Sequence, residues 1–209
     1  MSDLQSRYAA KLAPHLPPGT AREIARWIVE LRVTFVIAKP RKTKYGDFRI
    51  NLDGKNPRIS INGDLNPYAF LVTTIHEFAH YGCFLKHGHK AAPHGKEWKA
   101  IFSDLLRIFN ERKVFPQDLA HAIAKHLRQP TASSCSCPVL SRALAKYDER
   151  PATFLGDLRP GDTFHFNGEV FEYIEKRRTR CLCRNVKLGK DYLISIHAPV
   201  AETEKRELV

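Results

Sequence analysis

Apolar positions recur at helical spacing through the first two thirds of the chain and predict a series of amphipathic helices. The spacing is clear after Thr20, where one face carries Ile24, Trp27, Ile28 and Leu31. Asn66-Pro67 predicts the start of a longer helix. Ser2 is expected to cap the first helix, and Thr20 and Glu23 to form a capping box on the second. We expect helices over residues 2–13, 20–31, 66–86, 94–110, 116–128 and 139–147.

Alternating and β-branched segments predict strands in two regions of the chain. Three strands are expected at 33–38, 46–51 and 58–62, with Asp53-Gly54 in a turn between the last two. In the last third, short strand-like runs are separated by turn signals such as Asn167-Gly168. We therefore expect an α+β protein: helices and a small antiparallel or mixed sheet in a domain over 1–130, then a small all-β module over 131–209. The Pro/Ser-rich segment 129–138 marks the boundary.

The composition is that of a globular protein with a buried core. Hydrophobic residues make up 43% of the 209 residues and charged residues 27%. No apolar run is long enough for a membrane span, and the N-terminal segment lacks the apolar core of a signal peptide. We therefore expect a cytoplasmic protein with no membrane partner. Its five cysteines are then expected to be thiols or metal ligands rather than disulfides.

The net charge of +12 is unevenly distributed. Residues 1–130 carry 21 Lys/Arg against 11 Asp/Glu, a net of +10, whereas residues 131–209 carry 13 against 11, a net of +2. A positive field of this kind favours an anionic partner, of which nucleic acid is the commonest, although it also serves solubility alone.

The segment His76-Glu77-Phe78-Ala79-His80 fits the pattern H-E-x-x-H on a predicted helix. Residues four apart lie one turn apart on nearly the same face, so both imidazoles can reach one zinc ion. Glu77 lies about 100° further round the helix axis and is better placed to take a proton from a zinc-activated water than to bind the ion. Apolar residues surround the motif, and burying two histidines and a glutamate without a metal would be costly.

A peptidase zinc needs a third protein ligand and an open fourth position. His87 lies near the same helical stripe as His80 but about 10 Å along the axis, too far to share the ion. His89 could only just turn back towards it. His94 follows a loop long enough to return and is our preferred ligand, with Glu97 as a rival carboxylate.

Residues 20 to 110 resemble the SprT-like domain, a minimal zincin. The segments that carry the resemblance are RKTKYGDFRI (41–50), RISING (58–63), TTIHEFAHYG (73–82) and HGKEW (94–98). The resemblance implies that His76, His80 and His94 bind zinc and that Glu77 is the general base. It also implies peptide-bond hydrolysis, and it suggests association with DNA and action on DNA-associated or DNA-crosslinked proteins. The expected function is therefore that of a zinc metallopeptidase.

The last third departs from the zinc ribbon that is common in that family. Its cysteines form two C-x-C pairs, Cys135/Cys137 and Cys181/Cys183, which could hold a second, structural zinc ion or remain reduced thiols. Two basic clusters are candidate nucleic-acid contacts or solvated surface. They comprise Lys39, Arg41, Lys42 and Lys44 around Tyr45, and Lys176, Arg177, Arg178, Arg180 and Arg184.

Two further expectations concern the substrate. The strand at 58–62 is expected to present its edge to an extended peptide, and Tyr68 or Tyr81 is a candidate to stabilise the oxyanion. The rival hypothesis is a module in which zinc is structural and the protein binds nucleic acid or regulates transcription without cutting. A zinc hydrolase acting on another bond is a third possibility. The free carboxylate of Glu77 argues against a purely structural site.

Overall fold

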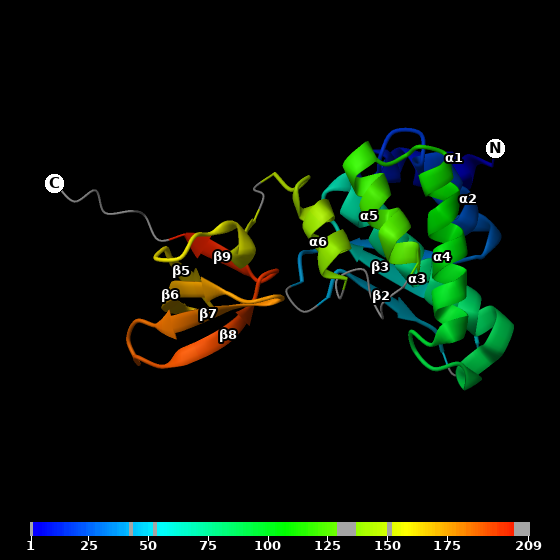
Figure 1. The fold of residues 1–209 in the computed structure, drawn as a ribbon. Helices are drawn as coiled ribbons and strands as arrows, with labels where there is room; N and C mark the ends of the chain where they lie inside the picture. Colours follow the sequence, from blue (N-terminus) through cyan, green and yellow to red (C-terminus); the bar gives the residue numbers. More distant parts are fainter. Residues whose placement is uncertain (1, 42–43, 52–53, 129–136, 150–151, 203–209) are drawn as a thin grey trace. The chain divides into compact units, whose positions relative to one another are not determined.

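A computed structural model describes residues 2–41, 44–51, 54–128, 137–149 and 152–202. The chain divides into two compact units, Met1–Glu149 and Arg150–Val209. Helices and a three-stranded sheet form the first unit and a six-stranded sheet forms the second, which confirms the α+β class (Figure 1). The unit boundary differs from the expected one at 130/131, because α6 (Pro138–Ala145) buries Leu140 and Leu144 in the core of the first unit.

The helices and strands of the first unit lie close to the predicted positions. They are α1 (Asp3–Leu12), α2 (Ala21–Glu30), β1 (Thr34–Ala38), β2 (Gly46–Arg49), β3 (Arg58–Asn62), α3 (Pro67–His87), α4 (Lys96–Glu111), α5 (Gln117–Arg128) and α6. Two single-turn 3₁₀ helices, η1 (Ala13–His15) and η2 (Gly88–Lys90), follow α1 and α3.

The two predicted N-terminal caps have different outcomes. Ser2 accepts a hydrogen bond from the backbone N–H of Gln5, as predicted. The capping box at Thr20 and Glu23 is wrong, because the Thr20 hydroxyl donates instead to the carbonyl of Pro17 at 2.7 Å. The Glu23 carboxylate accepts from Arg26, Trp27 and Arg112 and so ties α2 to the end of α4.

The three-stranded sheet has the order β1-β3-β2. β3 pairs with β1 in parallel and with β2 antiparallel. The expectation that residues 58–62 present a free edge is therefore wrong, because β3 uses the hydrogen-bonding groups of both its sides. The edges of this sheet are β1 and β2.

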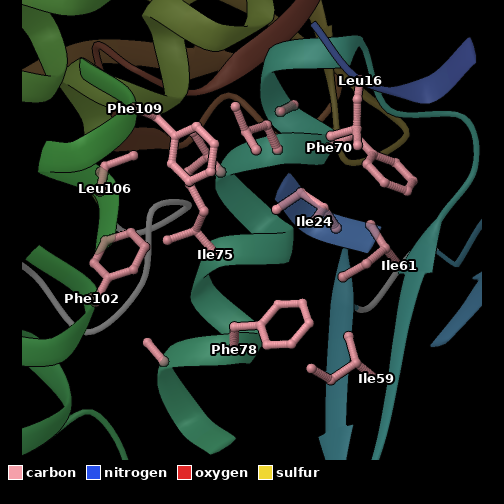
Figure 2. Close-up of a cluster of buried hydrophobic side chains, with 14 of the residues drawn as sticks. Leu16, Ile24, Ile59, Ile61, Phe70, Ile75, Phe78, Phe102, Leu106 and Phe109 are labelled. Carbon is pink, nitrogen blue, oxygen red and sulfur yellow. The ribbon is translucent and has the colours of Figure 1, made fainter. Parts of the chain in front are cut away.

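Helix α3 is the centre of the first unit. Asn66 caps it by accepting hydrogen bonds from the N–H groups of Tyr68 and Ala69, and Pro67 occupies its first turn. Its residues are apolar around most of the circumference, which is typical of a helix buried on several sides. Figure 2 shows side chains of the sheet and of α4 on opposite sides of α3, among them Ile59, Ile61, Phe102, Leu106 and Phe109. Packing on several sides therefore fixes the position of α3, the helix that carries the H-E-x-x-H motif.

The second unit is the small antiparallel sheet that the turn signals predict. Its strands are β4 (Thr153–Phe154), β5 (Thr163–Phe166), β6 (Glu169–Lys176), β7 (Arg180–Asn185), β8 (Asp191–Ser195) and β9 (Pro199–Glu202), in the order β4-β9-β5-β6-β7-β8. A turn of 3₁₀ helix, η4 (Leu155–Asp157), follows β4. The hydrophobic core of the second unit includes Phe164, Phe171, Tyr173, Cys181 and Cys183. Among the described residues of both units, no helix combines the length and the apolar character needed to cross a membrane.

Candidate metal centre

Three histidine side chains converge beside α3. His76 and His80 lie one turn apart on α3, and His94 lies in the loop that precedes α4. The Nε2 atoms are 3.1 Å apart between His76 and His80, 3.0 Å between His80 and His94, and 3.2 Å between His76 and His94. In the described part of the chain, these three residues form the one group that could hold a metal ion. The structure therefore brings together the three ligands that the sequence predicts.

The close approach of three ring nitrogens fits a shared cation. A neutral imidazole has one N–H donor, so three Nε2 atoms in mutual contact leave lone pairs facing one another. A divalent cation between them removes that repulsion. Two nitrogens bound to one tetrahedral zinc ion at about 2.0–2.1 Å lie about 3.4 Å apart, close to the observed separations. Three imidazoles are also a ligand set that zinc uses in catalytic sites, where a fourth position stays open.

Burial keeps the histidines in the neutral form that binds metals. It lowers the pKa of His76 to about 3, assisted by the proximity of His80 and His94. It lowers the pKa of His80 to about 4, with a smaller contribution from His94. The pKa of His94 is lowered as well, by burial first and by Lys99 second. All three imidazoles are therefore uncharged at pH 7 and offer lone pairs to a cation.

The indole ring of Trp98 packs against the imidazole rings of all three histidines. Its ring centroid lies 4.6 Å from that of His76, 5.2 Å from His80 and 4.7 Å from His94. It is fully buried and stacks on Phe102 at 4.9 Å. The contacts of Trp98 with His76 and His80 join α4 to α3, so local sequence spacing does not predict them.

The loop before α4 turns sharply to deliver His94. His94 has a φ of +58°, and the N–H of Gly95 closes the turn by donating to the carbonyl of Ala92. A side chain at Gly95 would approach that carbonyl to 3.0 Å, so the turn favours glycine. Helix α4 begins at Lys96, and its first turn carries Trp98.

Glu77 lies on another side of α3, against strand β2. It is buried, and its carboxylate accepts a hydrogen bond from the backbone N–H of Phe48. A side chain at Gly46 would collide with this carboxylate, so the glycine makes the contact possible. Burial raises the pKa of Glu77 to about 8, with Asp47 adding to the rise and the Phe48 N–H opposing it. The carboxylate is thus poised to exchange a proton near neutral pH.

The rival ligands lie outside the histidine cluster. Glu97 lies in the first turn of α4 and makes a long ion pair of 3.8 Å with Lys96. His87 is exposed at the end of α3, and the ring of His89 packs against Phe84. None of these three belongs to the group of side chains that could share one ion within the described residues.

The two tyrosines considered for oxyanion stabilisation have other partners. Tyr81 donates a hydrogen bond to the carbonyl of Leu31 at 3.4 Å. Tyr68 packs at the start of α3 against Tyr147, with ring centroids 4.8 Å apart. The ring contacts recorded for the three histidines in the described residues include neither tyrosine.

The four-cysteine zinc site stays a prediction. Cys135 lies outside the described residues, and Cys137 is half-buried at the start of α6 in the first unit. Cys181 and Cys183 are fully buried on one face of β7 in the core of the second unit, as the alternation predicts. Burial raises the pKa of Cys183 to about 12, with Cys181 adding to the rise, which favours the protonated thiol in the absence of a metal.

The two basic clusters differ in how their side chains are used. Arg41 is part of the fold: its guanidinium donates to the Asn62 side chain and to Ser60. Lys44 pairs with Asp47 at 2.8 Å, and Lys42 lies outside the described residues. In the second cluster, the residues from Lys176 to Arg180 are exposed. Arg177 among them pairs with Glu175.

Comparisons of the whole chain with protein-family models, with curated proteins and with solved structures find no match.

Proposed function

We propose that this protein is a zinc-dependent peptidase of the SprT-like type, with His76, His80 and His94 as zinc ligands and Glu77 as general base. The observation that carries the proposal is the convergence of three neutral imidazoles within 3.2 Å, next in sequence to a buried glutamate. A structural zinc site has no use for a buried carboxylate beside its ligands, whereas hydrolysis needs one. This supports the peptidase over a module in which zinc only stabilises the fold.

The three histidines and Glu77 have separate roles in the proposed reaction. Zinc, when bound, supplies Lewis-acid chemistry that polarises a carbonyl and acidifies water. The three histidines would hold the ion. Glu77 takes a proton from the attacking water at its carboxylate and passes it to the leaving amine. Its hydrogen bond from the Phe48 N–H fixes the orientation of the carboxylate.

Strand β2 is the better candidate to bind an extended substrate, in place of residues 58–62. β2 is an edge strand, so one row of its backbone groups is not used by β3. The Phe48 N–H that donates to Glu77 belongs to this row, which puts the carboxylate along the outer edge of the strand. A peptide that added to β2 would therefore run past Glu77.

The substitution Glu77→Gln tests the proposed chemistry. The amide keeps the size of the side chain but cannot take a proton, so cleavage of casein should fall by about 10²–10⁴-fold. Zinc content, measured by mass spectrometry, should stay at that of the wild type because Glu77 is not a ligand. The matched control is Glu97→Gln, which should cut at the wild-type rate. Undiminished proteolysis by Glu77→Gln would falsify the assigned role.

We also propose that the exposed basic segment between β6 and β7 contacts nucleic acid. Lys176, Arg178 and Arg180 are exposed at one turn, where cations can meet successive phosphates. Changing all three to glutamate should weaken binding of single-stranded DNA by about tenfold or more and flatten its salt dependence, since about 0.7 counterions are released per phosphate contact. Fluorescence anisotropy at several salt concentrations measures both. The control is Arg7, Lys11 and Lys125 changed to glutamate in the first unit, and equal losses in the two variants would show a diffuse charge effect.

A further inference from the structure

A small pocket lies beside the first turns of α3 and is not used by the metal centre. Its volume is about 70 Å³, and it is partly open to solvent. The walls come from the segment before β2, from α3 and the residues just before it, and from α6 with the residues that follow it. The lining residues are Tyr45, Leu65, Asn66, Ala69, Thr73, Ser141, Leu144, Ala145 and Asp148.

The pocket adjoins Glu77. Thr73 lines it and lies one turn before Glu77 on the same face of α3. A side chain at Gly46 would meet both residues, which places Thr73 and Glu77 side by side against β2. Tyr45 precedes that glycine, and its carbonyl accepts from the N–H of Asn62, so the wall it forms is anchored to β3. A substrate bound in extended form beside Glu77 would therefore place one of its side chains in this pocket.

The pocket combines aliphatic walls with one carboxylate that lacks a cationic partner. Leu65, Ala69 and Leu144 provide apolar surface. Asp148 is exposed and contacts Asn66, which lies about two helical turns before Thr73. Among the described residues, the Asp148 carboxylate has one partner, the side-chain amide of Asn66 at 2.6 Å. Its neighbour Lys146 does not neutralise it, because that ammonium pairs with Asp118. A carboxylate that has no cation beside it among the described residues attracts a cationic ligand at close range, although the net charge of the chain is positive.

The geometry selects among cationic side chains. Residues 66 to 73 span about 10 Å along the helix axis, so the pocket suits a long stem that starts near Thr73 and ends near Asp148. Lysine has a four-carbon stem and a compact ammonium group, whereas arginine pairs best with both oxygens of a carboxylate. One Asp148 oxygen already accepts from Asn66, which itself is fixed by a second bond to the carbonyl of Leu144. The free oxygen therefore matches a single ammonium better than a guanidinium.

We propose that this pocket is a specificity subsite that binds a lysine side chain of the substrate next to the scissile bond. The proposal rests on the proposed peptidase function and names the substrate class: proteins that carry a lysine next to the cleaved bond. Asp148 provides the charge, Asn66 holds it in place, and the aliphatic wall packs against the methylene stem.

The test compares peptides that differ at one position next to the cleaved bond. Lysine, norleucine, arginine and glutamate are placed there in turn, and kcat/KM is measured with the wild type, Asp148→Asn and Asp148→Lys. Lysine should exceed norleucine by about fivefold in the wild type, as expected for a partly exposed ion pair. Asp148→Asn should abolish this preference, and Asp148→Lys should transfer it to glutamate. The matched control is Asp104→Asn, an exposed carboxylate on α4 that should leave the preference unchanged.

A binding measurement separates this subsite from the peptidase reaction. Glu77→Gln and the double variant Glu77→Gln/Asp148→Lys are titrated with the fluorescent lysine and glutamate peptides. A reversal of peptide preference between the two proteins supports the subsite even where turnover is absent. Cleavage by the wild type without a preference for lysine, or a preference that Asp148→Lys does not change, overturns the subsite and leaves the peptidase intact. Absence of cleavage by zinc-loaded wild type, with the reversal present, would count against the peptidase alone.

Discussion

Each unit of this protein buries polar side chains, but their surroundings differ. In the second unit, Asn185 is fully buried and its side chain has partners: its amide donates to Glu169 on β6, and its oxygen accepts from the N–H groups of Lys187 and Leu188 in the turn that follows. In the first unit, the polar partners of the His76 Nε2 among the described residues are the ring nitrogens of His80 and His94. A buried polar group whose donors and acceptors have protein partners is explained by folding. A buried imidazole nitrogen that faces two further imidazole nitrogens fits a site that could hold a cation.

Removing one histidine gives the largest effect and tests that contrast directly. His80→Ala leaves two ligands, and zinc affinity should fall by more than the roughly 10–100-fold that changes around a metal site cost. Competition with a chelator measures the affinity. His89→Ala is the matched control, since His89 lies in the same histidine-rich segment but packs on Phe84. Equal losses in both variants would mean that the convergence of the three rings is not the binding site.

The cysteines of the second unit provide the next test of the comparison. We expect one zinc per chain in the wild type and in Cys181→Ser, because both thiols on β7 are buried in the sheet core. The serine hydroxyl should instead lower the stability of the protein by about 1–3 kcal/mol, the cost of burying a polar group in a site shaped for sulfur. Metal analysis and chemical denaturation measure the two quantities. Two zinc ions in the wild type and one in the variant would establish the four-cysteine site.

The sequence predicts the local features of the metal centre well. Asn66-Pro67 and the H-E-x-x-H spacing depend on helix geometry alone, so α3 and the pairing of His76 with His80 follow from it. His94 could be favoured over Glu97 because it ends a loop of suitable length. Each of these inferences uses residues that are close in the chain.

The features that the sequence does not predict join segments that are far apart. The central position of β3 depends on a parallel pairing with β1, which no turn signal encodes. The contact of Gly46 with Glu77 and the position of Trp98 under the histidines depend on how α3 meets β2 and α4. Thr20 fits the capping box by pattern, yet its hydroxyl finds Pro17 because the preceding turn brings that carbonyl closer.

The smallest predicted effect concerns His126, a buried polar group of the first unit that no metal explains. It lies on α5 with 2% of its surface exposed, and neither ring nitrogen has a hydrogen-bond partner among the described residues. Burial lowers its pKa below the ordinary value of 6.5. The unfolded chain therefore takes up a proton as the pH falls through about 6.5 while the folded protein does not, so stability present above that pH is lost below it.

His126→Leu should remove this dependence. The free energy of unfolding of the wild type should fall with decreasing pH more steeply than that of the variant, by at most about 1.4 kcal/mol per pH unit for one proton. Urea denaturation at pH 7.5, 6.5 and 5.5 measures the two slopes, and the three clustered histidines affect both proteins alike. His121→Leu on the same helix is the control, because His121 is exposed and its replacement should keep the wild-type slope. Parallel slopes for the wild type and His126→Leu would mean that the buried ring is protonated equally in both states, and then a hydrogen-bond partner must reach it.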